Sequence, residues 1–152
     1  MTSSYIFNSP LGHLKIITQD DALISLKYTH EKTSASPDTF QKSIVKQLQN
    51  YLENPHAKFN VKINLMGTPF QKRTWQALQT IPTGKTLTYG ELAKQLKTGP
   101  RAIGQACRTN PITIIVPCHR IVATDHIGGY AGNIKGEIHD KKIWLLKHEK
   151  AI

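Results

Sequence analysis

The sequence predicts an α/β (α+β) protein in two parts: an N-terminal antiparallel sheet with one helix, and a mainly helical C-terminal domain that contains a helix-turn-helix. Three observations predict this. Short β-rich runs separated by turn signals open the chain, a helical apolar repeat follows them, and helix caps and stops recur after residue 67. With 152 residues, 39% of them hydrophobic, the chain can build a real core in one compact domain or two small ones.

The first half is predicted to form a sheet followed by a helix. The stretch YIFNSPLGHLKIITQDDALISLKYTH holds short strands separated by NSPLG and TQDDA, as in an antiparallel meander. Apolar residues then recur every four positions, at Phe40, Ile44, Leu48 and Leu52. This repeat predicts a helix that Asp38 caps and that Asn54 and Pro55 end. Residues 58–65, KFNVKINL, alternate polar and apolar side chains and predict one further strand.

The second half is predicted to be mainly helical. In TPFQKRTWQALQTIPTG, Thr68 is a helix cap, Pro69 suits the first turn, and residues 82–84 end the segment. Two short helices, TYGELAKQL and RAIGQACRTN, are separated by KTGP, the arrangement of a helix-turn-helix. Many such helix pairs bind nothing, so the motif alone leaves DNA binding and simple packing as alternatives. Residues 140–150, DKKIWLLKHEK, predict the last helix.

The charge of the chain favours a polyanionic partner. Its 20 Lys and Arg against 10 Asp and Glu give a formal charge of +10, for which nucleic acid is the first candidate and a basic, solvated surface is the alternative. No stretch approaches the length of an apolar membrane span, and MTSSYIFNSP lacks the features of a signal peptide. We therefore expect a cytoplasmic protein with no membrane partner.

The two cysteines are predicted to be reduced thiols with different roles. They form no disulfide framework and lack the closely spaced partners of a structural zinc site. Cys107 belongs to an apolar helical stripe and is predicted to fill the core. Cys118 stands beside His119 and Arg120 in VPCHRIV. Because a free thiol has a pKa of about 8.5 and is only a few per cent thiolate at neutral pH, a nucleophilic cysteine needs such a base or positive field.

A histidine base usually needs a third group to orient its ring. Glu149, at the end of the last predicted helix, is a candidate. A carboxylate at the C-terminal end of a helix interacts unfavourably with the helix dipole, so its presence there suggests a specific role. The alternative is an exposed Glu149 screened by Lys147 and Lys150.

The ordered set GTPFQKRTWQAL, IPTGKTLTYGELA, RAIGQACRTNP, VPCHRIV, GGYAG and WLLKHE resembles the O6-alkylguanine-DNA alkyltransferases, also called methylated-DNA-protein-cysteine methyltransferases. The resemblance is close over residues 66–150, whereas the N-terminal half matches only in length and element order. It implies an RNase H-like α/β domain over residues 1–65 and a winged-helix-like catalytic domain over residues 66–152. It also implies direct-reversal repair of double-stranded DNA: a monomer, without metal or cofactor, transfers the alkyl group of O6-alkylguanine, with O4-alkylthymine as a further substrate, irreversibly to its own cysteine.

The resemblance assigns the chemistry to five residues. Cys118 matches the cysteine that keeps the alkyl group, His119 the histidine that activates it through a water, and Glu149 the carboxylate behind that histidine. Asn110 matches the asparagine that braces the turn carrying the cysteine. Tyr89 matches the tyrosine that helps to rotate the phosphate, contacts the flipped guanine and would protonate it at N3.

The resemblance also implies how DNA is bound. Arg101 matches the arginine that fills the vacated base stack, and Tyr130 and Ala131 match the lining of the guanine pocket. The helix-turn-helix enters the minor groove, where small residues give the helix room. The residues expected at this DNA surface are Arg101, Ala102, Gly104, Arg108 and Arg120.

Two departures from the family pattern carry expectations of their own. KTGPRA is shorter than the usual form, which makes Arg108 the alternative to Arg101 in the base stack. NIKGEIHDKK, residues 133–142, adds several residues and predicts a longer loop over the pocket.

Two other functions remain as alternatives. A non-enzymatic damage-binding module of the alkyltransferase-like kind would lack the nucleophile, which Cys118 supplies. A helix-turn-helix transcription regulator would leave the ordered spacing of the cysteine, histidine and carboxylate unexplained.

Overall fold

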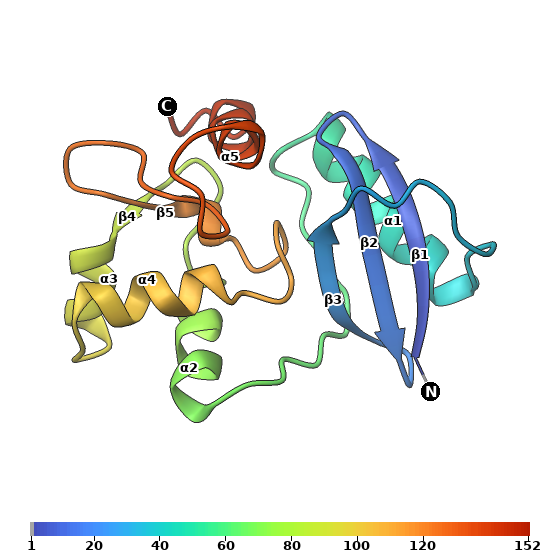
Figure 1. Ribbon diagram of the computed structural model, residues 1–152, viewed down its shortest axis with the longest axis horizontal. Coiled ribbons are helices and arrows are strands. Elements are labelled where there is room, and N and C mark those ends of the chain that lie inside the picture. The colour runs from blue at the N-terminus through green and yellow to red at the C-terminus, as the bar shows by residue number, and fades with distance from the viewer. Residues whose placement is uncertain (1) are drawn as a thin grey trace. The chain divides into compact units, whose positions relative to one another are not determined.

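The computed structural model describes residues 2–152 and divides into two compact units, one ending at Met66 and the other spanning Gly67–Ile152 (Figure 1). The elements in chain order are β1 (Thr2–Ser9), β2 (Gly12–Gln19), β3 (Ala22–Tyr28), α1 (Thr39–Glu53), α2 (Pro69–Leu78), β4 (Leu87–Thr88), α3 (Tyr89–Gln95), α4 (Pro100–Arg108), the 3-10 turn η1 (Cys118–Arg120), β5 (Ile121–Val122) and α5 (Glu137–His148). The predicted order of sheet, helix and helical domain is confirmed.

The N-terminal unit is an antiparallel meander with one helix, as predicted. The sheet has the order β1-β2-β3 and carries an irregularity between Ile17 and Thr18. Helix α1 begins in a capping box, in which Asp38 accepts a hydrogen bond from the Gln41 backbone and the Gln41 side chain accepts one from Asp38. The core of the unit combines strand residues with one face of α1 and includes Leu14, Ile16, Leu23, Leu26, Ile44, Leu48 and Tyr51.

The further strand predicted over residues 58–65 is wrong. These residues do alternate between half-buried and exposed side chains, which is the pattern that suggested a strand. The backbone, however, pairs with β3 at a single parallel bridge, Leu23 to Ile63. Alternation reports which side chains are covered, whereas a strand also requires a continued ladder of backbone hydrogen bonds, and here the ladder ends after one bridge.

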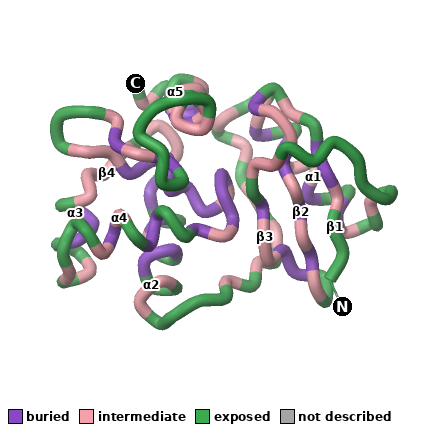
Figure 2. Tube along the Cα trace, viewed as in Figure 1, coloured by how far each residue is buried: buried purple, intermediate pink, exposed green. Residues whose placement is uncertain are grey.

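The C-terminal unit is held by apolar helix contacts. Thr68 caps α2 in a capping box with Gln71, and Pro69 occupies the first turn. The indole Nε1 of Trp75 donates to the carbonyl of Ala106 at 2.8 Å, which ties α2 to α4. Figure 2 shows the buried residues of this unit running along the inner parts of its helices and through the segment after α4. They include Leu78, Leu92, Ile103, Ile112, Ile121 and Leu145.

Helices α3 and α4 form the predicted helix-turn-helix. Thr88 caps α3 in a capping box with Glu91, and α4 begins with Gly99 as its N-cap and Pro100 in its first turn. Strands β4 and β5 pair in parallel beside them. Among residues 2–152, no helix combines the length and the apolar character needed to cross a bilayer.

The last helix begins earlier than residue 140, and this corrects the long loop expected over residues 133–142. Helix α5 starts at Glu137, so only residues 133–136 remain as a loop. Gly136, the N-cap, has φ +94, a conformation that glycine adopts without strain. Glu137 and Asp140 then lie in the first turn, where carboxylates interact favourably with the helix dipole.

Candidate active site

Cys118 lies at the start of the short turn η1, after a buried segment that Asn110 organises. The Asn110 amide donates to the carbonyl of Val116 at 2.8 Å, and its oxygen accepts the backbone N–H of Ile112 at 3.0 Å. These two bonds close the chain between α4 and η1 into a fixed loop. The thiol that follows it is buried, with 6% of Cys118 exposed.

His119 and Glu149 form the pair that the resemblance implied. Nε2 of His119 lies 2.9 Å from Oε2 of Glu149, and both side chains are fully buried. A carboxylate can only accept here, so Nε2 carries the hydrogen and Nδ1 keeps its lone pair. Nδ1 has no hydrogen-bond partner among residues 2–152. Burial lowers the pKa of His119 against the opposing effect of Glu149, which favours a neutral imidazole that can accept a proton.

Glu149 is therefore not the exposed residue of the alternative interpretation. It is the C-cap of α5 and is 2% exposed. The charge of this buried carboxylate is balanced by Arg120, which donates from Nε to Oε1 at 2.8 Å and from Nη2 to Oε2 at 2.9 Å.

The surroundings of Arg120 do not favour the expectation that it binds DNA. The residue is 9% exposed, and besides Glu149 its guanidinium donates to the carbonyl of Ile81 at 2.6 Å and to Oγ1 of Thr83 at 3.1 Å. A guanidinium used in this way offers little surface to a phosphate, since only 11% of the side chain is exposed. Arg120 instead orients the carboxylate that orients His119.

The environment of Cys118 disfavours a resting thiolate. Burial raises the pKa of the Cys118 thiol, and a hydrogen bond with Asn110 and the charge of Lys142 oppose this only in part. Cys107 is also buried, as predicted, and burial raises the pKa of its thiol too. A nucleophilic Cys118 therefore needs a base that takes its proton during the reaction.

Lys142 is the site residue that the sequence interpretation missed. It is fully buried in α5, and its ammonium donates to the carbonyls of Ile121 at 2.5 Å and Gly129 at 2.9 Å. Burial lowers its pKa to about 8. The one sequence feature that pointed to Lys142 was its position within the apolar repeat of the last helix. That position does not distinguish a buried lysine from one whose apolar stem is covered while its ammonium group reaches solvent.

A pocket of about 240 Å³ opens at the thiol. Its lining includes seven of the residues expected at the site, namely Tyr89, Arg101, Gly104, Arg108, Cys118, Tyr130 and Ala131. Cys107 and Ile134 also line it, and Ile134 is 79% exposed. The pocket thus collects residues from the helix-turn-helix, the catalytic turn and the loop before α5. Ala102 lies on α4 but does not line this pocket.

The hydroxyl groups of the two pocket tyrosines differ in their hydrogen bonds. The Tyr130 hydroxyl forms a buried hydrogen bond with Oγ1 of Thr113. The Tyr89 hydroxyl donates a long hydrogen bond, 3.5 Å, to the carbonyl of Gly129 and makes no shorter one within residues 2–152. Burial raises the pKa of Tyr89 to about 12, so it keeps its proton at neutral pH and is available as a donor.

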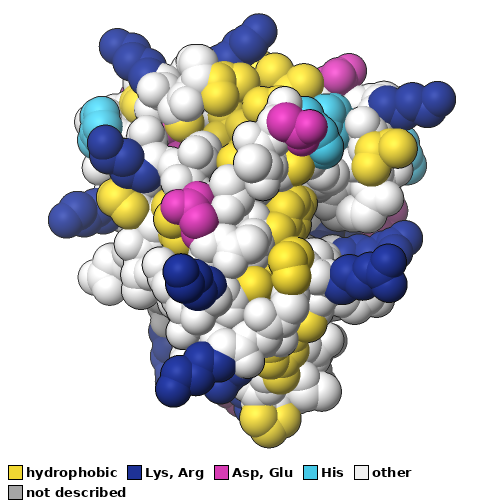
Figure 3. Space-filling model, turned by 90° about the vertical axis from the view of Figure 1, so that its left-hand side faces the viewer, with side chains coloured by type: hydrophobic (Ala, Val, Ile, Leu, Met, Phe, Trp, Pro, Cys, Tyr) yellow, Lys and Arg dark blue, Asp and Glu magenta, His cyan; other side chains and the backbone are white. Residues whose placement is uncertain are grey.

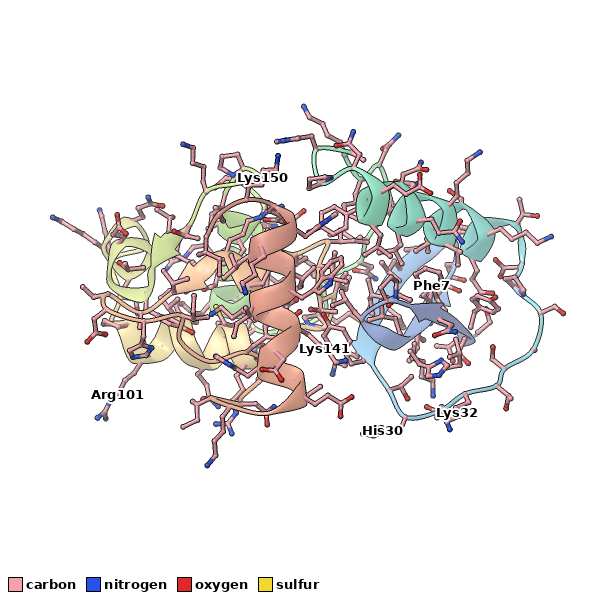
Figure 4. The ribbon with its side chains drawn as sticks, turned by 90° about the horizontal axis from the view of Figure 1, so that it is seen from above. Phe7, His30, Lys32, Arg101, Lys141 and Lys150 are labelled. Carbon is pink, nitrogen blue, oxygen red and sulfur yellow. The ribbon has the colours of Figure 1, made fainter. Side chains whose placement is uncertain are left out.

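Arg101 and Arg108, by contrast, are exposed. Figure 4 shows Arg101 extending outward from α4, and Figure 3 shows Lys and Arg side chains projecting at many points on the side of the molecule nearest α3. A polyanion could meet this surface. Among residues 2–152, no group of three or more His, Cys, Asp or Glu side chains is placed to hold a metal ion.

Comparison with known proteins shows the family to which the chain belongs. Residues 69–151 match the family model described as 6-O-methylguanine DNA methyltransferase, DNA binding domain. The methylated-DNA-protein-cysteine methyltransferase of Mycolicibacterium paratuberculosis is 37% identical over 94% of this chain and 89% of its own length. That of Methanosarcina acetivorans is 38% identical over 95% of this chain and 96% of its own.

Solved structures extend the similarity to the whole fold. The Mycobacterium tuberculosis O6-methylguanine methyltransferase superimposes with a TM-score of 0.86 at 35% identity, over 99% of this chain and 94% of that one. The M. tuberculosis OGT in complex with DNA gives a TM-score of 0.82 at 36% identity, over 96% and 91% of the two chains. The chain belongs to the family of methylated-DNA-protein-cysteine methyltransferases.

Proposed function

We propose that this protein repairs DNA directly, by moving the alkyl group of O6-alkylguanine onto Sγ of Cys118. The observation that carries the proposal is the meeting of a buried thiol, a buried His119–Glu149 pair and a base-sized pocket in one unit. The relatives and the solved structure with DNA, whose names give this activity and this partner, support it.

The chemistry begins with proton removal from the thiol. Nδ1 of His119, the ring nitrogen left with a lone pair, takes the proton of Cys118 through a bridging water. The thiolate attacks the alkyl carbon, a carbon–sulfur bond forms and the bond from that carbon to O6 breaks. The Tyr89 hydroxyl protonates guanine N3, so neutral guanine leaves rather than an anion. His119 then returns its proton to the Tyr89 oxygen by way of solvent.

The reacting base must leave the duplex first. A guanine stacked in DNA cannot bring O6 to a buried thiol, and extruding it costs a few kcal/mol. Arg101, exposed at the pocket mouth, fills the gap in the stack and offsets part of this cost. A Cβ added at Gly104 would lie 4.0 Å from the Tyr89 ring, so internal packing does not demand glycine here. Ala102 and Gly104 instead allow the DNA backbone to approach α4, and Arg108 contacts phosphate.

The product is a thioether, which has no route to hydrolysis, so each molecule acts once. Intact mass after incubation with excess O6-methylguanine duplex tests this. We expect one added methyl group per chain, located on Cys118 by peptide mapping, and the same result for Cys107→Ala. Continued turnover, or methyl transfer by Cys118→Ala, would refute the proposal. DNA binding without any mass change would favour a damage-binding module instead.

We also propose that the protein works as a monomer in the cytoplasm. The formal charge of +10 favours contact with DNA over self-association. Light scattering of the free protein and of its complex with a short duplex should give one protein chain in each. A dimer in either sample would contradict the monomer.

A further inference from the structure

Two side chains of α5, one turn apart, hold two successive carbonyl groups at the pocket. Nε2 of His139 lies 2.7 Å from the carbonyl oxygen of Gly128, and Nζ of Lys142 lies 2.9 Å from that of Gly129. Because a carbonyl oxygen can only accept, Nε2 of His139 carries the hydrogen. Helix α5 therefore binds the Gly128–Gly129 segment through hydrogen bonds to two successive carbonyl groups.

This segment sets one wall of the pocket. Gly129 and Tyr130 line the pocket, and the carbonyl of Gly129 is also the group that the Tyr89 hydroxyl approaches at 3.5 Å. Gly128 packs directly against Tyr89: an added Cβ would lie 3.0 Å from a ring carbon and 3.2 Å from the hydroxyl oxygen. A shift of the segment by a few tenths of an ångström would therefore alter both the wall and the position of the tyrosine that meets the base.

The segment cannot hold this position through its own backbone. Residues 123–129 form no helix or strand, and Gly128 has φ +80. Glycine has the widest backbone freedom of any residue, so two consecutive glycines need outside contacts to fix them. Such contacts come from His139, from Lys142 and from His126, whose Nδ1 accepts the Gly128 N–H at 3.0 Å.

We propose that His139 is a positioning residue for the base pocket, which fixes the Gly128–Gly129 wall against Tyr89 and so sets the affinity for the extrahelical guanine. This inference rests on the proposed alkyl transfer. His139 isolates the effect better than Lys142, because Lys142 also donates to Ile121 and its charge acts on Cys118.

The test separates base binding from chemistry. Transfer from free O6-benzylguanine is followed under single-turnover conditions over a range of concentrations. In His139→Leu the half-saturating concentration should rise about tenfold, as for loss of one good hydrogen bond. The limiting rate should fall by less than this, because Cys118, His119 and Glu149 are untouched and only the placement of Tyr89 is disturbed. His139→Gln, whose amide can donate to the same carbonyl, should recover most of the affinity. His30→Leu, an exposed histidine of the other unit, is the matched control.

A second measurement does not depend on transfer. Calorimetric titration of O6-benzylguanine into Cys118→Ala should show affinity falling about tenfold when His139→Leu is added, and recovering with His139→Gln. Unchanged affinity with leucine would overturn the inference, as would equal losses with leucine and glutamine. If the wild type transfers no alkyl group while the Cys118→Ala variants show these changes in affinity, the proposed function is overturned and the positioning role of His139 stands.

Discussion

Replacement of Arg120 by alanine tests whether this residue supports Glu149, as its contacts suggest, or binds DNA, as the sequence interpretation expected. The guanidinium makes four hydrogen bonds, two of them to the buried carboxylate of Glu149. Arg120→Ala removes all four and leaves Glu149, 2% exposed, without the guanidinium that balances its charge. The change should therefore act on folding and on the orientation of His119, and only indirectly on DNA binding.

The size of the loss follows from burial. Removing one partner of a buried ion pair costs about 3–5 kcal/mol, because the other charge stays desolvated. For a unit the size of Gly67–Ile152, each kcal/mol lowers the melting temperature by roughly 4 °C or more. Arg120→Ala should thus melt at least about 12 °C below the wild type.

Thermal unfolding followed by circular dichroism measures this directly. Arg101→Ala is the matched control, since Arg101 is exposed and its loss should change the free energy of unfolding by no more than about 0.5 kcal/mol. If Arg120→Ala melts like the wild type while the salt dependence of DNA binding falls by about one counterion, Arg120 is a phosphate contact and the argument from burial fails.

Three further predictions concern the relay, the DNA surface and the buried lysine. Glu149→Gln should slow alkyl transfer about a hundredfold or more while DNA affinity, measured by fluorescence anisotropy, changes little; equal transfer rates would remove Glu149 from the relay. Arg101→Ala should slow repair of duplex DNA at least about tenfold but leave transfer from free O6-benzylguanine near the wild-type rate; a normal duplex rate would make Arg108 the next residue to test. Because burial lowers the pKa of Lys142 to about 8, the folded state binds fewer protons than the unfolded state between pH of about 8 and 10.5, so this group adds stability as pH rises through that window. Urea unfolding should show that the free energy of unfolding of the wild type, relative to that of Lys142→Met, rises by up to about 3 kcal/mol across this pH window. A difference between the two proteins that stays constant with pH would contradict the lowered pKa.

The helices show what a local pattern can predict. Asp38 and Thr68 cap the helices that follow them, as predicted, and the predicted apolar repeat of α1 includes Ile44 and Leu48 of its buried face. These features depend on residues three or four positions apart, which the sequence places side by side. The segment 58–65 shows the limit, because its alternation matched partial burial while the pairing that makes a strand depended on β3, more than thirty residues earlier.

The sequence by itself determined the cysteine, histidine and carboxylate of the proposed relay, because their type and order form a specific pattern and the resemblance supplied their roles. The tertiary structure alone decided which charges meet. Arg120 and Glu149 lie 29 positions apart, and the carbonyls that Lys142 and His139 hold lie 11 to 21 positions before them. A charged residue can face solvent, a phosphate or a buried partner with equal local propensity. Only the packing of α5 against the turn and loop around Cys118 removes water from these groups, and desolvation then requires that each charge be paired.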